Sequence, residues 1–378
     1  FTDIGNGSCF YVPNHILVLY ETWKWIGSGT FGDVMKLQSQ HPQRPTLAVK
    51  KFVAPFTSHQ RAKRCYREIQ LLTELKRRKH ENIVEMGLVY VTTRTAEEMQ
   101  SVYFVLRYAG DDLCKLILAE TADNHRFAVR HYKRMLSQLL RALLYLLSAG
   151  VIHRDIKPAN LAVDASGKLT LIDFGLARSI MVNGAMTADP GTPAYRAIEA
   201  YSFGNSPAPL KYDQKAEMWS VGAILCEMLT GRVLFNDPHN NCILTAVQVC
   251  GSVPEHVLSE IANGKWQKDL RERKADRINF LEMLTNDDGR IWLFGDIIDN
   301  GKTLIDFIDR TLDFDQTNRM TVDEALAHPF LAEVREPWRE VRAKDPFPPD
   351  ACDKHVDEWK GLIHGAAREY MTKGLVQN

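Results

Sequence analysis

The sequence predicts an α+β chain of two lobes, a small β-rich N-terminal lobe with one helix and a larger, mainly helical C-terminal lobe. Strand-like runs interrupted by glycine dominate the chain up to about residue 108, and leucine-rich helical patterns follow. A length of 378 residues also exceeds what one ordinary domain holds. We place the first lobe at residues 1–108, the second at 109–330 and a C-terminal extension at 331–378.

Within the first lobe, four apolar runs have strand composition, and we expect strands at residues 16–20, 46–52, 83–91 and 102–108. One helix is expected over residues 58–78, because Tyr66, Ile69, Leu72 and Leu75 recur at a spacing of three. The short polar segment Ala-Gly-Asp-Asp at residues 109–112 predicts the joint between the lobes.

Helical patterns dominate the rest of the chain. Residues 127–148 form a long leucine-rich segment, and residues 218–229 are apolar nearly all round, which predicts a buried helix. The proline-rich run at 345–350 indicates an extended strap that leads to a last helix near 356–370.

Composition excludes several classes of protein. With 45% hydrophobic and 25% charged residues the chain is not disordered as a whole, and 47 basic residues balanced by 47 acidic ones give no general attraction to nucleic acid or to a membrane. Seven scattered cysteines without a Cys-x-x-Cys pair indicate reduced thiols. We expect no transmembrane helix, and the initial Phe indicates a trimmed chain start.

A glycine-rich motif, Gly-Ser-Gly-Thr-Phe-Gly-Asp-Val, occupies residues 27–34 between two strand-like runs. Its small residues allow backbone amides to approach phosphate oxygens closely. A dinucleotide-binding fold would need a helix directly after the glycines, and here a strand follows. Alone the motif also fits an ordinary glycine-rich hairpin.

A lysine follows on the next strand, where Ala-Val-Lys ends at Lys50. A cation there could neutralise nucleotide phosphates, and Glu68 on the following helix is its expected ion-pair partner. Lys51 points to the opposite face of the strand, since side chains alternate. Judged separately, Lys50 and Glu68 would also fit a surface lysine and a solvated glutamate.

The decisive stretch is Val-Ile-His-Arg-Asp-Ile-Lys-Pro-Ala-Asn-Leu at 151–161, followed by Asp-Phe-Gly at 173–175. Asp155 is placed to accept a hydroxyl proton, Lys157 to steady a transferred phosphoryl group, and Asn160 and Asp173 to hold magnesium. In this order the motifs resemble those of the eukaryotic protein kinases, from about residue 23 to residue 330.

The resemblance implies a bilobal protein kinase fold and further site residues. Thr192 joins Asp155, Lys157, Lys50 and Glu68 in the implied catalytic set. The implied nucleotide contacts, with Leu106 as gatekeeper, are Ile26, Gly27, Ser28, Gly29, Gly32, Val34, Ala48, Lys50, Leu106, Tyr108, Ala109, Asp112 and Ala162. His153 and Phe174 fit the core better than a ligand role.

Further motifs narrow the family. Arg319 matches the buried partner of Glu199, while Glu217 stands where kinases usually carry aspartate and Ile198 where they carry proline. Tyr-Arg at 195–196 resembles the group of MAP kinases and cyclin-dependent kinases, whose arginine shapes a pocket for proline. Asp-Glu-Trp-Lys at 357–360 is similar to the stress-activated MAP kinases, which implies that residues 331–378 pack back on the N-terminal lobe and disfavours a cyclin-dependent type.

The activation lip departs from that family. Thr187-Ala188-Asp189 stands where MAP kinases carry Thr-x-Tyr, so one phosphoacceptor is absent. The cluster expected to receive phosphothreonine is nevertheless complete, with Arg64, Arg67, Arg154 and Arg178. We therefore expect regulation by phosphorylation at Thr187 alone, or appreciable basal activity.

Two other departures concern recognition. Pro-Ala at 193–194 replaces the usual Arg-Trp near the substrate pocket, which weakens the expectation of proline direction through Arg196. The tail segment Arg-Glu-Pro-Trp-Arg-Glu at 335–340 mixes charges where the family carries an acidic docking patch, so we expect altered or weaker docking.

The resemblance thus implies a MAP kinase-like serine/threonine kinase of stress signalling that uses ATP and Mg²⁺. Its implied partners are an upstream MAP kinase kinase, protein substrates and phosphatases, with neither nucleic acid nor membrane. We expect a monomer in cytoplasm and nucleus. The alternative is a catalytically weak homologue that acts as a scaffold or decoy, suggested by the altered lip, Ile198 and Glu217.

Overall fold

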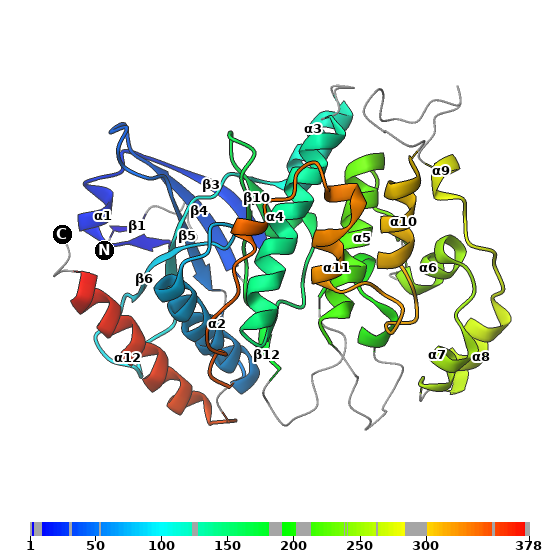
Figure 1. Cartoon of the computed structure of the whole chain (residues 1–378). Coiled ribbons are helices and arrows are strands. Elements are labelled where there is room, and N and C mark those ends of the chain that lie inside the picture. The colour runs from blue at the N-terminus through cyan, green and yellow to red at the C-terminus, as the bar shows by residue number, and fades with distance from the viewer. Residues whose placement is uncertain are drawn as a thin grey trace. The chain divides into compact units, whose positions relative to one another are not determined.

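A computed structural model of the chain (Figure 1) describes residues 2–3, 10–29, 32–52, 54–122, 128–180, 191–201, 213–237, 239, 241–261, 264–283, 301–349 and 352–374. The chain divides into two units. The first holds Phe1–Ala109, Asp173–Gly175 and Asp350–Asn378, and the second holds Gly110–Ile172 and Leu176–Pro349. No helix in the described ranges is both long and apolar enough to cross a membrane.

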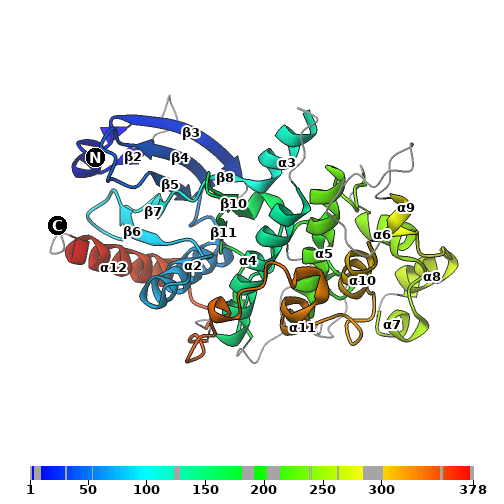
Figure 2. The ribbon, with the colours of Figure 1, turned by 45° about the horizontal axis from the view of Figure 1, so that its top comes forward.

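The first unit is built on a five-stranded antiparallel sheet (Figure 2) in the order β3-β4-β5-β7-β6. The strands are β3 (Thr22–Gly29), β4 (Gly32–Gln38), β5 (Leu47–Phe52), β6 (Met86–Val91) and β7 (Val102–Arg107). Strand alternation puts Lys50 and Lys51 on opposite faces, as predicted, and the structure buries Lys50 and leaves Lys51 half-exposed.

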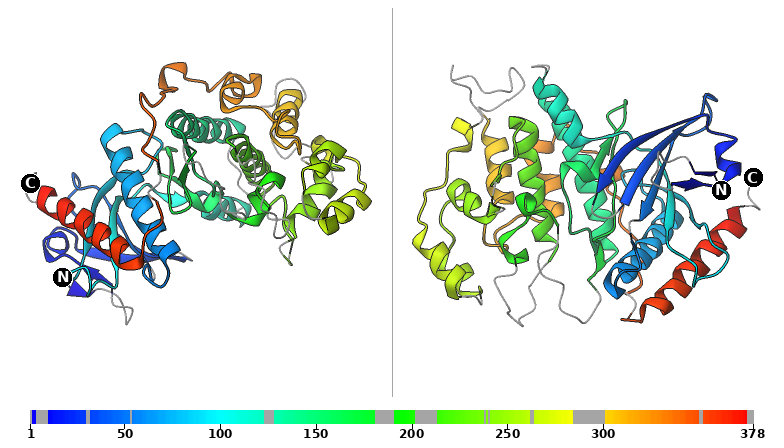
Figure 3. Two further views of the ribbon diagram at one scale, coloured as in Figure 1. Left: turned by 90° about the horizontal axis from the view of Figure 1, so that it is seen from below. Right: turned by 180° about the vertical axis from the view of Figure 1, so that it is seen from behind.

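Helix α2 (His59–Arg78) follows β5, and the hydroxyl of Ser58 caps its first turn by accepting a hydrogen bond from the N–H of Arg61. Helix α12 (Val356–Gly374) lies beside α2 and β6 (Figure 3). There the indole of Trp359 is fully buried against the ring of Tyr66.

The N-terminal segment corrects one prediction, because residues 16–20 form no strand. Pro13 precedes the short helix α1 (Asn14–Leu17), and a turn follows. The buried side chains Val12, Ile16 and Tyr20 lie four residues apart, a helical period that the continuous apolar run conceals. They join the core formed with the sheet, and β1 (Thr2–Asp3) pairs with β2 (Tyr11–Val12).

Two helices form the centre of the second unit, α4 (Val129–Ser148) and α5 (Lys215–Thr230). Residues 216–229 of α5 are all buried, which confirms the prediction for that helix. Around them lie α3 (Leu113–Ala122), α6 (Cys242–Cys250), α7 (Glu255–Ser259), α8 (Gly264–Glu272), α9 (Phe280–Met283), α10 (Lys302–Thr311) and α11 (Val322–Ala327).

The second unit also contains short paired strands, which flank its loops. β8 (Asp111–Asp112), β10 (Leu161–Val163) and β11 (Leu169–Leu171) form one sheet, and β9 (Val151–Ile152) pairs with β12 (Arg178–Ser179). The described 3-10 turns are η1 (Pro158–Asn160), η2 (Pro193–Tyr195), η3 (Ile198–Ala200), η5 (Pro329–Leu331) and η6 (Pro337–Arg339).

The predicted ion pair between Arg319 and Glu199 forms and links two distant segments of the second unit. The fully buried guanidinium donates to both carboxylate oxygens at 2.6 and 3.2 Å, and also to the carbonyls of Asp313 and Lys215. It lies over the ring of Trp219, so the charge is enclosed by partners on several sides.

The C-terminal extension, residues 331–378, is divided between the two units. Residues 331–349 belong to the second unit, where the N–H of Phe347 donates to the carbonyl of Ala149 and the Phe347 ring is buried. Only the part from Asp350 onward groups with the first unit, where Lys63 pairs with Asp353 at 2.6 Å. Six cysteines in the described ranges are free thiols.

Candidate functional site

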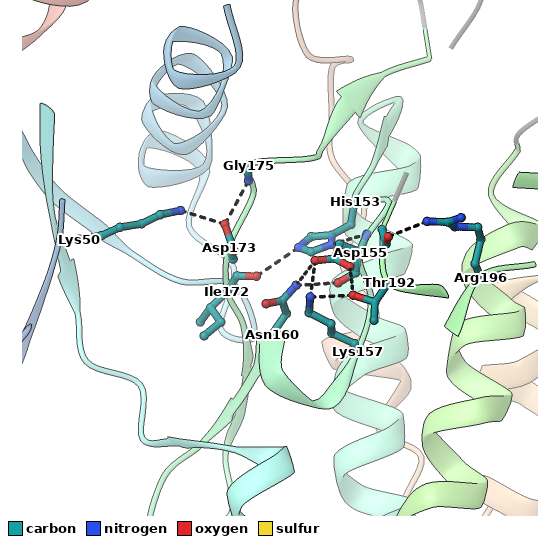
Figure 4. A network of polar contacts seen from close by, with 11 residues as sticks. Lys50, His153, Asp155, Lys157, Asn160, Ile172, Asp173, Gly175, Thr192 and Arg196 are labelled. Carbon is teal, nitrogen blue, oxygen red and sulfur yellow. Dashed lines mark hydrogen bonds and ion pairs between the residues drawn. The ribbon is translucent and has the colours of Figure 1, made fainter. Parts of the chain in front are cut away.

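In the first unit, Lys50 lies between two carboxylates, of which Figure 4 shows that of Asp173. Its ammonium is 2.8 Å from Glu68 Oε1 and 2.9 Å from Asp173 Oδ1. Strand β5 supplies the lysine, helix α2 the glutamate, and the Asp-Phe-Gly segment the aspartate, whose backbone takes the left-handed φ of 58°. The predicted Lys50–Glu68 ion pair therefore forms.

For both Lys50 and Glu68, burial shifts the pKa in one direction and neighbours of opposite charge shift it in the other. Burial alone lowers the pKa of Lys50, but the carboxylates of Asp173 and Glu68 outweigh it and raise the pKa above the ordinary value. Burial raises the pKa of Glu68, and Lys50 counteracts that rise. The ammonium is thus held as a cation with fixed direction, which suits the binding of a phosphate oxygen.

In the second unit, Asp155, Lys157 and Thr192 form a closed group (Figure 4). Lys157 Nζ lies 2.9 Å from Asp155 Oδ2 and donates to Thr192 Oγ1 at 2.8 Å, and Thr192 donates to Asp155 Oδ1 at 2.9 Å. The carboxylate of Asp155 is therefore oriented through both oxygens. A carboxylate held in this way can accept a proton from a hydroxyl placed beside it.

Asn160 orients the same loop and suits a cation. Its buried amide nitrogen donates to the backbone carbonyl and to Oδ2 of Asp155 at 2.7 and 2.9 Å, so Oδ1 is the oxygen that remains to accept. A carbonyl oxygen of this kind is a ligand that Mg²⁺ takes, usually with few protein ligands and several from phosphate or water. Within the described ranges no three acidic, histidine or cysteine side chains gather as a metal cluster.

Glu217 on α5 holds the loop that carries Asp155. Its Oε1 accepts the backbone N–H of His153 at 2.6 Å and of Arg154 at 2.9 Å. Burial raises the pKa of Glu217 to about 7, although the two N–H groups and the charge of Arg154 lower it. Glu217, which stands where the family usually carries aspartate, thus fixes two consecutive peptides of this loop.

His153 is a core residue, as predicted. Its Nδ1 accepts the N–H of Asp155 at 3.3 Å, which leaves the proton on Nε2 for the carbonyl of Ile172 at 3.2 Å. The ring is fully buried, and Phe174 is 1% exposed. Arg154, between His153 and Asp155, has a φ of 70°, a backbone conformation that costs energy outside glycine.

The glycine-rich hairpin joins β3 to β4, with Gly27 opposite Val34 and Gly29 opposite Gly32. A Cβ on Gly32 would lie 2.5 Å from the carbonyl oxygen of Lys51, so this position accepts only glycine. Across the hairpin Ser28 donates to Asp33 Oδ1 at 2.6 Å.

The remaining predicted nucleotide contacts lie on the sheet strands. In the first unit Val34 is opposite Lys50 and Ala48 is opposite Leu106, while Ile26 is half-buried beside the glycines. Tyr108 and Ala109 follow β7, and the N–H of Tyr108 donates to the carbonyl of Thr46. These pairings bring Val34, Ala48, Lys50 and Leu106 onto neighbouring strands.

Two predicted contacts belong to the second unit. Ala162 is opposite Asp112 in the pairing of β10 with β8. Asp112 pairs with Lys115 at 2.7 Å and accepts the N–H of the same residue at the start of α3. A nucleotide contact by Asp112 would therefore compete with this helix cap.

Around Arg196 the structure brings together Gly191 and Tyr201, which the sequence did not single out. The guanidinium donates to the carbonyl of Gly191 at 2.9 Å and stacks on the ring of Tyr201, whose hydroxyl donates to the carbonyl of Pro193. Gly191 has a φ of 76°, and a Cβ there would lie 2.5 Å from the carbonyl oxygen of Arg154. A lone glycine before Thr192 was the available sequence signal.

A second group that sequence reasoning missed holds the same segment to α5. Tyr195 donates its hydroxyl to Glu227 at 2.6 Å, and Ser220 donates to the backbone carbonyl of Tyr195 at 2.7 Å. Burial raises the pKa of Tyr195, and the neighbouring Glu227 adds to the rise. Nothing in the local sequence indicates these pairs, because their members lie 25 and 32 residues apart.

The predicted regulatory residues are only partly described. Thr187 and Asp189 lie outside the described residues. Arg64 and Arg67 lie half-buried on α2 in the first unit, and Arg64 approaches Gly175. Arg154 and Arg178 lie in the second unit, where Arg178 on β12 faces Ile152 on β9.

Comparisons with known proteins agree with these motifs. The protein kinase domain model matches residues 20–331. Mitogen-activated protein kinase 12 of Rattus norvegicus is 32% identical over 354 residues, covering 92% of this chain and 88% of the relative. HOG1 of Gibberella zeae is 33% identical over 359 residues, covering 93% and 90%. HOG1B of Wallemia ichthyophaga is 31% identical over 372 residues, covering 97% and 92%.

Proposed function

Because the chain belongs to the protein kinase family and, within it, to the MAP kinase-like serine/threonine kinases, we propose that it transfers the γ-phosphate of Mg-ATP to serine or threonine hydroxyls followed by proline. The observation that carries this proposal is the bonded group of Asp155, Lys157 and Thr192. It provides a fixed proton acceptor with a cation beside it.

In the proposed reaction the substrate hydroxyl gives its proton to Asp155 while its oxygen forms a bond to the γ-phosphorus. The bond from that phosphorus to the bridging oxygen breaks, and ADP leaves with the electron pair. Lys157 stabilises charge on the transferred group, and Lys50 orients the α and β phosphates. Mg²⁺, when bound by Asn160 and Asp173, would neutralise phosphate charge.

The preference for proline is supported by the contact between Arg196 and Gly191. The Gly191 carbonyl already accepts from the guanidinium at 2.9 Å, so it is a poor partner for the backbone N–H of an arriving substrate. A substrate residue whose N–H finds no acceptor pays a desolvation cost. Proline has no N–H and avoids that cost.

We propose that phosphorylation of Thr187 by an upstream MAP kinase kinase regulates this activity, and that phosphatases reverse it. A phosphate carries about −1.5 to −2 charges and can order a loop through arginines. The candidates are Arg64, Arg67, Arg154 and Arg178. Asp189 would supply one permanent charge at the second position of the lip. Cytoplasm and nucleus are the proposed sites of action.

The test measures transfer of labelled γ-phosphate to matched peptides that contain Ser-Pro or Ser-Ala. Wild-type protein, protein treated with a MAP kinase kinase, and the Thr187→Ala variant are compared, with Asp155→Asn as the blank. We expect transfer above the blank and a preference for Ser-Pro that Arg196→Ala reduces. ATP binding without transfer in any state would favour the scaffold alternative.

A further inference from the structure

The second unit carries a tryptophan that is largely exposed to solvent. The side chain of Trp338 in η6 is 74% exposed, and Val341 three residues later is 51% exposed. Tryptophan and arginine are the residues that most often dominate the energy of protein interfaces, and Arg339 lies beside this tryptophan. We refer to residues 333–342 together with their ion-pair partners as the Trp338 patch.

The acidic side chains of the Trp338 patch are all engaged by the protein's own cations. Glu333 contacts both Arg130 and Lys133, at 3.0 and 3.4 Å. Glu336 lies 2.9 Å from the buried Arg141 and 3.5 Å from Arg339. Each of these two carboxylates is therefore shared by two cations.

The two other carboxylates each face one arginine. Glu340 receives a bidentate contact from Arg335 at 2.8 and 3.0 Å, and Asp323 on α11 pairs with Arg342. The patch thus holds four acidic and six basic side chains, a surplus of two positive charges. Arg130, Arg339 and Arg342 keep about half of their side-chain surface exposed, at 55, 47 and 54%.

This arrangement of charges favours a partner segment that is negatively charged. A basic segment would have to displace internal cations from carboxylates that are already paired, whereas an acidic segment meets half-exposed guanidinium groups that can contact a second carboxylate. An apolar side chain of the same segment would cover Trp338 and Val341 and remove their surface from water.

We propose that the Trp338 patch binds a partner protein through a short segment in which acidic residues flank a large apolar residue. This surface consists only of residues of the second unit and uses none of the proposed catalytic groups. Binding there is consequently measurable without ATP, so its failure and a failure of the proposed phosphoryl transfer are distinguishable.

The experiment measures fluorescence anisotropy of the labelled peptide Glu-Asp-Leu-Phe-Asp-Glu with the full chain, beside Lys-Arg-Leu-Phe-Arg-Lys as the charge-reversed probe. We expect micromolar binding of the acidic peptide and at least tenfold weaker binding of the basic one. Raising the salt from 50 to 300 mM weakens an interaction of this kind, because exposed charges are screened.

Three variants decide where the peptide binds. Trp338→Ala and Arg339→Glu should each weaken binding at least tenfold, and Trp23→Ala, which truncates an exposed tryptophan on β3, should leave it unchanged. Circular dichroism establishes that each variant is folded. The proposal is overturned if the acidic peptide does not bind, if the basic peptide binds equally well, or if Trp23→Ala weakens binding as much as Trp338→Ala.

Discussion

The carboxylate of Glu217 accepts the backbone N–H of His153 at 2.6 Å. The same oxygen also accepts the N–H of Arg154, so one buried group on α5 fixes two consecutive peptides of the loop that carries Asp155. The other oxygen, Oε2, is buried and receives no hydrogen bond from the described residues. Burial with one oxygen unpaired disfavours the charged form of this carboxyl group.

We predict a pH-dependent contribution of Glu217 to stability. Its pKa rises from the ordinary value of 4.5 to about 7 in the folded protein, so the folded state binds the proton more strongly. The stabilisation is present below pH 4.5 and is lost as the pH rises to 7, with a total of about 3 kcal/mol. Urea unfolding at pH 5 and pH 8 measures the free energy of unfolding.

Glu217→Gln provides the reference for that measurement, because its side chain has no carboxyl proton to lose. Relative to this variant the wild type should lose about 2.5 kcal/mol between the two pH values, because a small part of the stabilisation is already lost at pH 5. In the control Glu333→Gln, which alters an exposed ion pair, the free energy of unfolding should change between the two pH values as much as in the wild type. Equal pH dependence of the wild type and Glu217→Gln would contradict the assignment.

Arg319→Ala should destabilise the second unit by about 3 to 5 kcal/mol, because Glu199 would keep a charge without its buried partner. The matched control is Arg310→Ala, whose exposed contact with Glu324 spans 3.8 Å and contributes below about 1 kcal/mol. Denaturant unfolding of both variants gives the comparison. Similar losses for the two would show that burial of the Arg319 pair is unimportant.

Lys50→Ala should reduce the rate of phosphoryl transfer by about 10²-fold or more, because a preorganised cation is removed. Lys51→Ala is the neighbouring control, since its side chain leaves the opposite face of β5. Single-turnover transfer with saturating ATP separates the chemical step from binding, and thermal melting checks that both variants fold. A comparable loss in Lys51→Ala would exclude a specific role for Lys50.

Gly191→Ala should lower kcat/KM for Ser-Pro peptides at least tenfold. The new Cβ would lie 2.5 Å from the Arg154 carbonyl at a φ of 76°, so the segment before Thr192 must shift. Gly264→Ala is the control, because nothing lies within 4 Å of its Cβ position in α8. Steady-state kinetics with both peptides would refute the prediction if Gly191→Ala kept wild-type activity and Ser-Pro preference.

Local patterns in the sequence predicted much of the fold. The spacing of Tyr66, Ile69, Leu72 and Leu75 predicted α2, and alternation in β5 predicted that Lys50 and Lys51 point to opposite faces. The strand predicted at residues 16–20 was wrong, because Pro13 begins a helical turn and every fourth side chain packs inward. A continuous apolar run has no period that separates these outcomes.

The candidate site likewise has residues that the sequence predicted and contacts that only the structure shows. Ordered motifs predicted Asp155, Lys157 and Asn160, which lie close together in the chain, and Asp173 thirteen residues further on. The contacts that orient them could not be inferred locally. Glu217 reaches His153 across 64 residues, and Glu227 reaches Tyr195 across 32.

The sequence by itself determined the family, the order of the chemical groups and the absence of tyrosine from the activation lip, because these depend only on which residues occur at which spacing. The tertiary structure alone decided that Glu217 still anchors its loop, that Arg196 occupies the carbonyl of Gly191, and that the acidic residues around Trp338 are neutralised internally. Glu217 lies 64 residues from His153 and Glu336 lies 195 residues from Arg141, so these pairs form only where packing brings distant segments together. Arg196 and Gly191 are five residues apart, and their contact depends on the backbone turn between them, which the spacing alone does not fix.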